Sequence, residues 1–138
     1  MKILEVLTSK RITCNFGERA AIKHLKKNGY KILRRNLVSS GYEIDIVAKN
    51  KEYLVFCEVK TRTVKDGTAL SAASAVTPEK QRQIIAAARP YATRFKKDRK
   101  IRFDCIEVYV TDVGEAKKIQ KINHMVGAFN RNTAYRKG

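Results

Sequence analysis

Two acidic residues and a lysine, Asp45, Glu58 and Lys60, occur at a spacing that suits metal-dependent hydrolysis. Side chains alternate along a β-strand, so Glu58 and Lys60 share one face of their strand. If the segment around Asp45 pairs with that strand as an antiparallel hairpin, a loop of two or four residues around Asn50 to Tyr53 brings Asp45 to the same face. The three side chains can then converge.

A further acidic residue, Glu18, lies at a position where an apolar side chain is expected. The segment from about Asn15 to Asn28 is predicted to be a helix, because Ala21, Ile22 and Leu25 recur at helical spacing. Glu18 falls on that apolar stripe and not on the charged face of the helix. It can join the other carboxylates if the helix packs on that side of the sheet.

Converging carboxylates imply a cation. They repel each other and raise one another's pKa unless a positive charge sits between them. Oxygen ligands without histidine or cysteine suit Mg²⁺ or Mn²⁺. Such a metal lowers the pKa of a bound water and neutralises charge on a scissile phosphate, while an adjacent lysine such as Lys60 can orient the water or stabilise the transition state. The pattern therefore predicts phosphodiester hydrolysis.

The charge of the chain indicates a polyanionic partner. Its 138 residues carry 30 Lys and Arg against 13 Asp and Glu, a formal net charge of +17, with 43% hydrophobic residues that can build one core. Clustered cations favour binding to nucleic acid, because each neutralised phosphate releases counterions. No stretch is long and apolar enough for a signal sequence or a membrane span. We therefore expect a cytoplasmic protein that binds DNA, with RNA left open, and no membrane.

Cysteine and histidine give no local sign of a site. Cys14, Cys57 and Cys105 form no C-x-x-C pair, so disulfides are not expected. His24 and His124 are far apart in the sequence and have no nearby metal-ligating neighbour. We interpret both histidines as structural or surface residues.

The predicted elements form an α/β domain. After the first helix come three strands, a second helix that begins at Thr77-Pro78 and a fourth strand, in the order αβββαβ. Pro90 should kink or split the second helix. Residues 117–129 could form a further strand plus a short helix, and a basic, flexible tail is expected over 131–138. The predicted strands are Tyr30 to Val38, Glu43 to Lys49, Tyr53 to Lys60 and Ile101 to Thr111.

An ordered set of motifs resembles a known family. Asp45-x₁₂-Glu58-Val59-Lys60 resembles the D…(D/E)-x-K signature of the PD-(D/E)XK nuclease superfamily. More closely, the chain is similar to the YraN family of small predicted bacterial endonucleases over about residues 16–130. The similar segments are GERA at 17–20, GYKILRRN at 29–36, EIDIVA at 43–48, VFCEVKTR at 55–62, RFD at 102–104 and AF at 128–129.

The resemblance implies a fold and a metal site. The fold is a restriction-endonuclease-like αβββαβ core, a mixed β-sheet flanked by helices, in a single domain over 1–138. The implied Mg²⁺ or Mn²⁺ ligands are Glu18, Asp45, Glu58 and the carbonyl of Val59, with Lys60 at the water. Analogy with junction resolvases also implies a homodimer. The family usually has Gly directly before the Glu of its G-E-I-D motif, whereas this chain has Tyr42, a departure at the entry of the second strand.

Several residues admit two interpretations. Arg62 is a candidate phosphate contact or an ordinary surface arginine, and Lys80 either faces the site or lies on the helix surface. Glu43 is interpreted as a solvated strand-end residue, and Asp104 as a structural hydrogen-bonding group. Glu58 and Lys60 could also form an ordinary ion pair at a strand end.

The resulting hypothesis is a metal-dependent endonuclease that acts on DNA, in repair, recombination or DNA uptake, with branched or damaged substrates suggested by the resemblance. The alternative is a nucleic-acid-binding protein of nuclease fold with little or no catalytic activity. A third reading, a ribosome-associated RNA-binding protein, leaves the acidic cluster unexplained.

Overall fold

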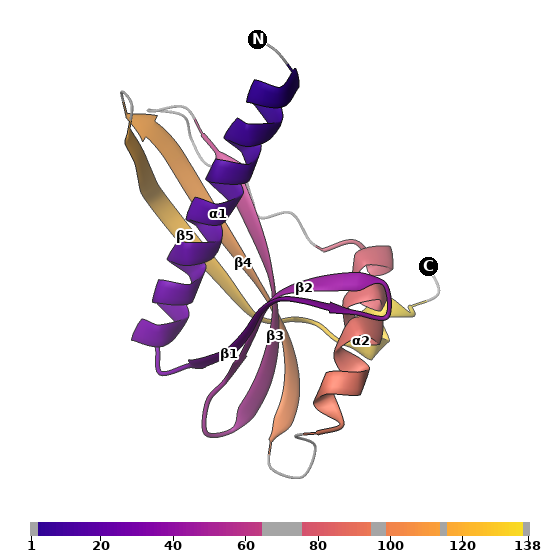
Figure 1. Cartoon of the computed structure of the whole chain (residues 1–138). Helices are drawn as coiled ribbons and strands as arrows, with labels where there is room; N and C mark the ends of the chain where they lie inside the picture. The colour runs from indigo at the N-terminus through magenta and orange to yellow at the C-terminus, as the bar shows by residue number, and fades with distance from the viewer. Residues whose placement is uncertain (1–2, 65–75, 95–98, 114–115, 137–138) are drawn as a thin grey trace.

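A five-stranded mixed sheet with helices on both faces forms the domain (Figure 1). The computed structural model describes residues 3–64, 76–94, 99–113 and 116–136. The strands are adjacent in chain order: β1 (Lys31–Ser39), β2 (Tyr42–Lys49), β3 (Tyr53–Thr63), β4 (Lys100–Val113) and β5 (Ala116–Phe129). The helices are α1 (Ile3–Lys27), α2 (Pro78–Ala92) and α3 (Arg131–Ala134). The α/β class with a mixed sheet flanked by helices is thus confirmed.

The pairing of the strands follows from their connections. β1, β2 and β3 are joined by short turns and pair antiparallel, as do β4 and β5. β3 and β4 pair in parallel, and α2 lies between them in the sequence, because parallel neighbours need a long crossover. Thr77 caps α2 by accepting a hydrogen bond from the backbone N–H of Lys80, and Pro78 occupies the first turn, as the sequence predicts.

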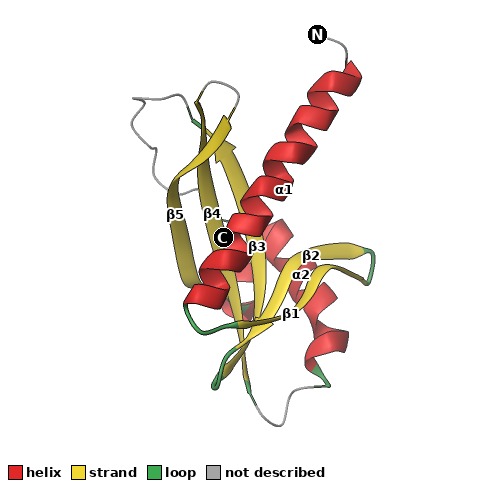
Figure 2. Ribbon diagram, turned by 60° about the vertical axis from the view of Figure 1, so that its left-hand side comes forward, coloured by secondary structure: helices red, strands yellow, loops and turns green. Residues whose placement is uncertain are grey.

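Each face of the sheet carries its own apolar core. On one face, α2 and α3 pack against residues that include Phe56, Phe103 and Phe129. On the other face, Ala21 and Leu25 of α1 are fully buried against the sheet. Figure 2 shows α1 crossing in front of the sheet with α2 behind it. The apolar stripe predicted for the first helix is therefore its buried face.

The twist of the sheet opens a fork between β2 and β3. The antiparallel ladder between them covers only four pairs and ends at Ile46 and Cys57. Beyond that pair β2 continues beside β1, and β3 continues beside β4, so the two strands diverge. In Figures 1 and 2 the β1–β2 hairpin splays away from β4 and β5. Asp45 and Glu58 are the first residues past the ladder, one on each branch; we call this place the fork.

Three segments differ from the prediction. α1 begins at Ile3, about three turns before the predicted start. Residues 117–129 form one strand without a helix, because β4 offers partners along nearly its whole length. Residues 131–134 are not a flexible tail but the helical turn α3. It is held by a reciprocal capping box between Asn130 and Thr133 and by a 2.7 Å hydrogen bond from Arg82 to the carbonyl of Ala134.

Pro90 does not split α2. The helix continues through it to Ala92, and the backbone N–H of Thr93 still donates to the carbonyl of Arg89. Pro90 lacks the N–H that would donate to the carbonyl of Ala86, so the helix loses one hydrogen bond but continues for two more residues. No helix in the described ranges is long and apolar enough to cross a membrane.

Candidate active site

The register of the β2–β3 hairpin places two carboxylates at the fork. Lys49 pairs with Leu54, so four residues separate the paired positions, the even loop that the sequence requires. Asn50 closes this turn, because its side-chain oxygen accepts hydrogen bonds from the backbone N–H groups of Glu52 and Tyr53 at 3.0 and 2.7 Å. Continued by one step, the same register sets Asp45 opposite Glu58.

The carboxylate of Asp45 replaces the missing strand ladder. Since β2 no longer pairs with β3 at this point, the backbone N–H of Val59 has no partner from β2, and Asp45 Oδ2 accepts its hydrogen bond at 2.8 Å. Burial nevertheless raises the pKa of Asp45, while the Val59 hydrogen bond and the charge of Lys80 act in the opposite direction. The Asp45 carboxylate is therefore held in one orientation in a partly desolvated environment.

Glu58 is the most strongly perturbed carboxyl of the fork. Burial, and then the charge of Asp45, raise the pKa of Glu58 from 4.5 to about 7, although Lys80 and Lys60 counteract the shift. Lys80 Nζ lies 3.9 Å from Glu58 Oε1, and the Glu58 side chain is only 14% exposed. Lys80 thus faces the site, one of the two interpretations that the sequence left open. Glu58 titrates near neutral pH, as groups at functional sites often do.

Glu18 approaches the fork from α1. Burial and the charge of Asp45 raise the pKa of Glu18, while Arg35 lowers it. The preceding residue explains the close approach: Gly17 is buried against Thr61 of β3, and a Cβ on Gly17 would lie 2.9 Å from both Cβ and Cγ2 of Thr61. A helix with a larger residue at this position could not lie so near the strand.

The four acids of this region are electrostatically coupled. The charge of the exposed Glu43 raises the pKa of Glu18, Asp45 and Glu58. In the described part of the chain, however, no group of three or more His, Cys, Asp or Glu side chains is already placed to hold a metal ion. The fork therefore offers a pair of carboxylates, Asp45 and Glu58, with Glu18 and Glu43 at longer range.

Arg62 has a different partner from the one expected of a phosphate contact. Its Nε donates to Oε2 of Glu107 at 2.9 Å, and Asn123 Nδ2 donates to the other oxygen of Glu107 at 3.3 Å. Glu107 is fully buried, and in the parallel β3–β4 register it is paired with Lys60. An acid inside the apolar strand β4 is one signal of this group in the sequence, but nothing there indicates its partners.

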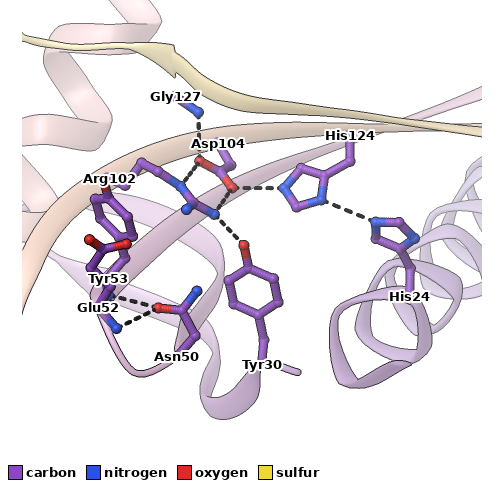
Figure 3. Close-up of polar contacts among 9 residues, drawn as sticks. All are labelled: His24, Tyr30, Asn50, Glu52, Tyr53, Arg102, Asp104, His124 and Gly127. Atoms are coloured by element: carbon purple, nitrogen blue, oxygen red, sulfur yellow. Dashed lines mark hydrogen bonds and ion pairs between the residues drawn. The ribbon is translucent and has the colours of Figure 1, made fainter. Parts of the chain in front are cut away.

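The two histidines meet in a polar network on the α1 face (Figure 3). His24 Nε2 lies 3.1 Å from His124 Nδ1, and His124 Nε2 lies 2.7 Å from Asp104 Oδ2. Asp104 also accepts hydrogen bonds from two Arg102 nitrogens, Nε and Nη2, and from the backbone N–H of Gly127. The network links α1 to β4 and β5, so these residues have structural partners.

Charge pairing keeps the Asp104 carboxylate ionised. Burial alone would raise its pKa, but hydrogen bonds from His124, Arg102 and Gly127 hold the pKa of Asp104 below its usual range. The Arg102 guanidinium also lies over the ring of Tyr53 at 4.7 Å and donates to the Tyr30 hydroxyl. The structural role expected of Asp104 is confirmed. Cys57 and Cys105 are free and buried, which agrees with the expectation of no disulfide between them.

Comparison with known proteins identifies one family. The family model described as "Uncharacterised protein family UPF0102" matches residues 17–108, which include Glu18, the fork, Lys60, Arg62 and Lys80. A UPF0102 protein of Caldanaerobacter subterraneus subsp. tengcongensis is 40% identical over 88% of this chain and 97% of its own length. Another from Herminiimonas arsenicoxydans is 38% identical over 77% and 84%, and one from Pelobacter propionicus is 42% identical over 86% and 83%.

Proposed function

The chain belongs to the UPF0102 family, and we propose that it is an endonuclease that hydrolyses phosphodiester bonds of DNA with Mg²⁺ or Mn²⁺ bound at the fork. The observation that carries this proposal is the position of Asp45 and Glu58 at the divergence of β2 and β3, where burial raises the pKa of both and the charge of Asp45 raises that of Glu58 further. We also place the chain in the PD-(D/E)XK superfamily, on the motif Asp45-x₁₂-Glu58-Val59-Lys60.

The donor set fits a hard divalent cation. Asp45 and Glu58 offer carboxylate oxygens, the ligands that Mg²⁺ and Mn²⁺ prefer, and among the described residues no histidine shifts the pKa of either group. Burial raises the pKa of both groups although nearby lysines act in the opposite direction, so a bound divalent cation would further stabilise the two charged carboxylates. The ligands in this proposal are Asp45, Glu58 and the carbonyl of Val59, and Glu18 of α1 is proposed as a further ligand.

The protein's own residues divide the work as follows. Asp45 is held in one orientation by the Val59 N–H, so it presents its other oxygen without reorganisation. Lys60 follows Glu58 by two residues on the same face of β3, where its ammonium can orient water or stabilise charge on the phosphate. Lys80, 3.9 Å from Glu58, can pair with a neighbouring phosphate. A bound divalent cation would supply an activated water and neutralise charge on the scissile phosphate.

Charge supports a nucleic acid as the substrate. Over the whole chain 30 Lys and Arg face 13 Asp and Glu, a net charge of +17. Acids that gather in so basic a protein would weaken the binding of a polyanion unless a cation joins them. An enzyme that cuts DNA explains both features, whereas the charge alone explains only binding. A homodimer, which would bring two forks to two strands, belongs to the same proposal.

Incubation of the purified protein with Mg²⁺ or Mn²⁺ and with linear, flapped and four-way-junction DNA tests the proposal directly. We expect metal-dependent cleavage by the parent protein and none by Glu58→Gln. The matched control is Glu79→Gln, an exposed acid in the first turn of α2 that is not among the charges acting on Asp45 or Glu58. Cleavage by Glu58→Gln would refute the proposed nuclease function. So would a parent protein that cleaves none of the substrates with either metal.

A binding protein without catalysis is the second candidate. Lys80 already sits beside Glu58, and no three-ligand group is assembled in the described residues, two findings that favour it. This function predicts that Mg²⁺ and Mn²⁺ change neither the melting temperature nor the affinity for DNA. Stabilisation by either metal would count against it.

A further inference from the structure

A cavity of about 770 Å³ lies away from the fork, between the C-terminal half of α2, the start of β4, the end of β5 and the start of α3. None of Asp45, Glu58, Lys60 and Lys80 lines it. Cavities of this size commonly hold small ligands or parts of larger ones. The proposed catalytic chemistry does not use it.

The wall of the cavity is apolar and aromatic. Phe103 and Phe129 contribute to it and stack on each other, with ring centroids 5.3 Å apart and an angle of 20° between the planes. Ile101, the second residue of β4, adds an exposed aliphatic side chain. A flat, apolar group such as a nucleobase fits a wall of this kind, because aromatic and aliphatic side chains pack well on its face.

Apart from the hydroxyl of Thr93, the polar side chains that line the cavity are cationic or amide groups. Arg89 comes from the last turn of α2, while Arg131 and the exposed Asn132 come from α3. No Asp or Glu lines the cavity, and within the described residues neither Arg89 nor Arg131 forms an ion pair. Arg102 also borders it, but its guanidinium points to Asp104 and Tyr30 on the other face (Figure 3).

From this combination we infer that the cavity binds an unpaired nucleotide of a nucleic-acid strand. The apolar wall would receive the base, the amide of Asn132 can donate to and accept from a base edge, and Arg89 and Arg131 would pair with phosphate. A fatty acid would use the wall and the cations but make no specific contact with the amide, and an acidic peptide would leave the aromatic wall unfilled.

The position along α2 extends this inference to the substrate. Lys80 lies beside Glu58 in the first turn of α2, and Arg89 lies nine residues later at the cavity. At about 1.5 Å per residue the two are about 14 Å apart along the helix, the length of about four nucleotide steps in a duplex. If the fork cleaves DNA as proposed, this separation puts a flipped or single-stranded base a few nucleotides from the bond that is cut.

A fluorescent variant can detect the base directly. The chain contains no tryptophan, so Thr93→Trp introduces a single reporter at an exposed position on the cavity rim and leaves Arg89, Arg131 and Asn132 in place. With a metal chelator present, a short single-stranded deoxyadenosine oligomer should quench its fluorescence through stacking. The same oligomer in a duplex, or an abasic oligomer with the same phosphates, should bind with little quenching. Equal quenching by all three would overturn the inference.

A matched pair of charge reversals tests whether Arg89 contributes to binding of the single strand. Arg89→Glu should weaken binding of the single-stranded oligomer about tenfold more than Arg94→Glu, while both weaken duplex binding alike. Arg94 is exposed near the same helix end but does not line the cavity. Equal effects on the single strand would refute the cavity as the binding site. Because these assays involve no cleavage, cleavage without quenching rejects the cavity alone, and quenching without cleavage rejects the nuclease alone.

Discussion

Gly17 of α1 packs so closely against Thr61 of β3 that a methyl group on the glycine would lie 2.9 Å from the Cβ and Cγ2 of the threonine, and closer still to its Oγ1. This contact sets how near α1 comes to the fork, because Glu18 is the next residue. It also gives a role to the first residue of the GERA segment, which the sequence marks only by resemblance.

Gly17→Ala should therefore destabilise the protein, although alanine is the better helix former. Alanine gains about 1 kcal/mol over glycine inside a helix, whereas overpacking a tight contact costs about 1–3 kcal/mol. We expect the clash to prevail, and denaturant unfolding should show a lower free energy of unfolding. The double variant with Thr61→Ala should recover part of the loss. A more stable Gly17→Ala protein would contradict the close approach of α1.

Glu58→Gln should stabilise the metal-free protein at alkaline pH. The pKa of Glu58 is about 7 in the folded protein and about 4.5 when exposed, so the folded state holds its proton more tightly. Stability from this group is complete below about pH 4.5 and is lost as the pH rises through 7. Glutamine removes the penalty, a gain of about 2–3 kcal/mol above pH 7 that fades toward pH 4.5.

Thermal unfolding of the parent and Glu58→Gln across this pH range measures that gain. Glu52→Gln, an exposed acid in the β2–β3 turn, is the control and should show no such pH-dependent difference. If Glu58→Gln is less stable than the parent at pH 8, the carboxylate is held by favourable contacts and the fork does not lack positive charge.

His24 should make stability depend on pH in the opposite direction. Burial, followed by the charges of His124 and Lys27, lowers the pKa of His24 below 6.5 in the folded protein. Just below pH 6.5 the unfolded chain binds the proton more readily, so stability falls as the pH drops through that range. His24→Gln should remove this loss. Measurement in the Glu58→Gln background isolates it from the opposing effect of Glu58, and an unchanged pH profile would show that His24 stays solvated.

The local features of this site were predictable, and the long-range ones were not. Alternation along β2 and β3 and an even loop closed by Asn50 suffice to bring Asp45 opposite Glu58. The apolar stripe of α1 likewise explains why Glu18 is partly buried. Nothing local could pair His24 with His124, because that contact depends on how α1 crosses the sheet to reach β5.

The same limit applies to the partners of charged residues in the strands. Glu107 accepts from Arg62 because β3 and β4 run in parallel in a register that only the crossover through α2 determines. For that reason the guanidinium of Arg62, which was expected to contact a phosphate, is paired with Glu107. The capped turn α3 was also missed, since its signal, Asn130 with Thr133, occupies only four residues in a basic segment.

Binding to DNA should be strongly dependent on salt and weakly dependent on sequence. With a net charge of +17, phosphate contacts dominate, and each releases counterions. The logarithm of the binding constant should fall steeply and linearly with the logarithm of the salt concentration for unrelated duplexes alike. A slope near zero would show that the charge does not serve nucleic-acid binding.

The proposed division of labour at the fork predicts that metal binding and turnover separate by residue. Asp45→Asn removes a ligand, so it should abolish both stabilisation by Mn²⁺ and cleavage, while DNA binding persists or strengthens because a negative charge has gone. Lys60→Ala should keep the Mn²⁺-induced rise in melting temperature and lose cleavage, because the lysine acts on water and phosphate and not on the ion.

Lys51→Ala, an exposed lysine in the β2–β3 turn, is the charge-matched control and should retain both properties. Melting curves with and without Mn²⁺, beside cleavage assays on the same preparations, measure the separation. If Mn²⁺ stabilises Asp45→Asn as much as the parent protein, the carboxylates of the fork are not ligands, and the binding protein without catalysis becomes the better description.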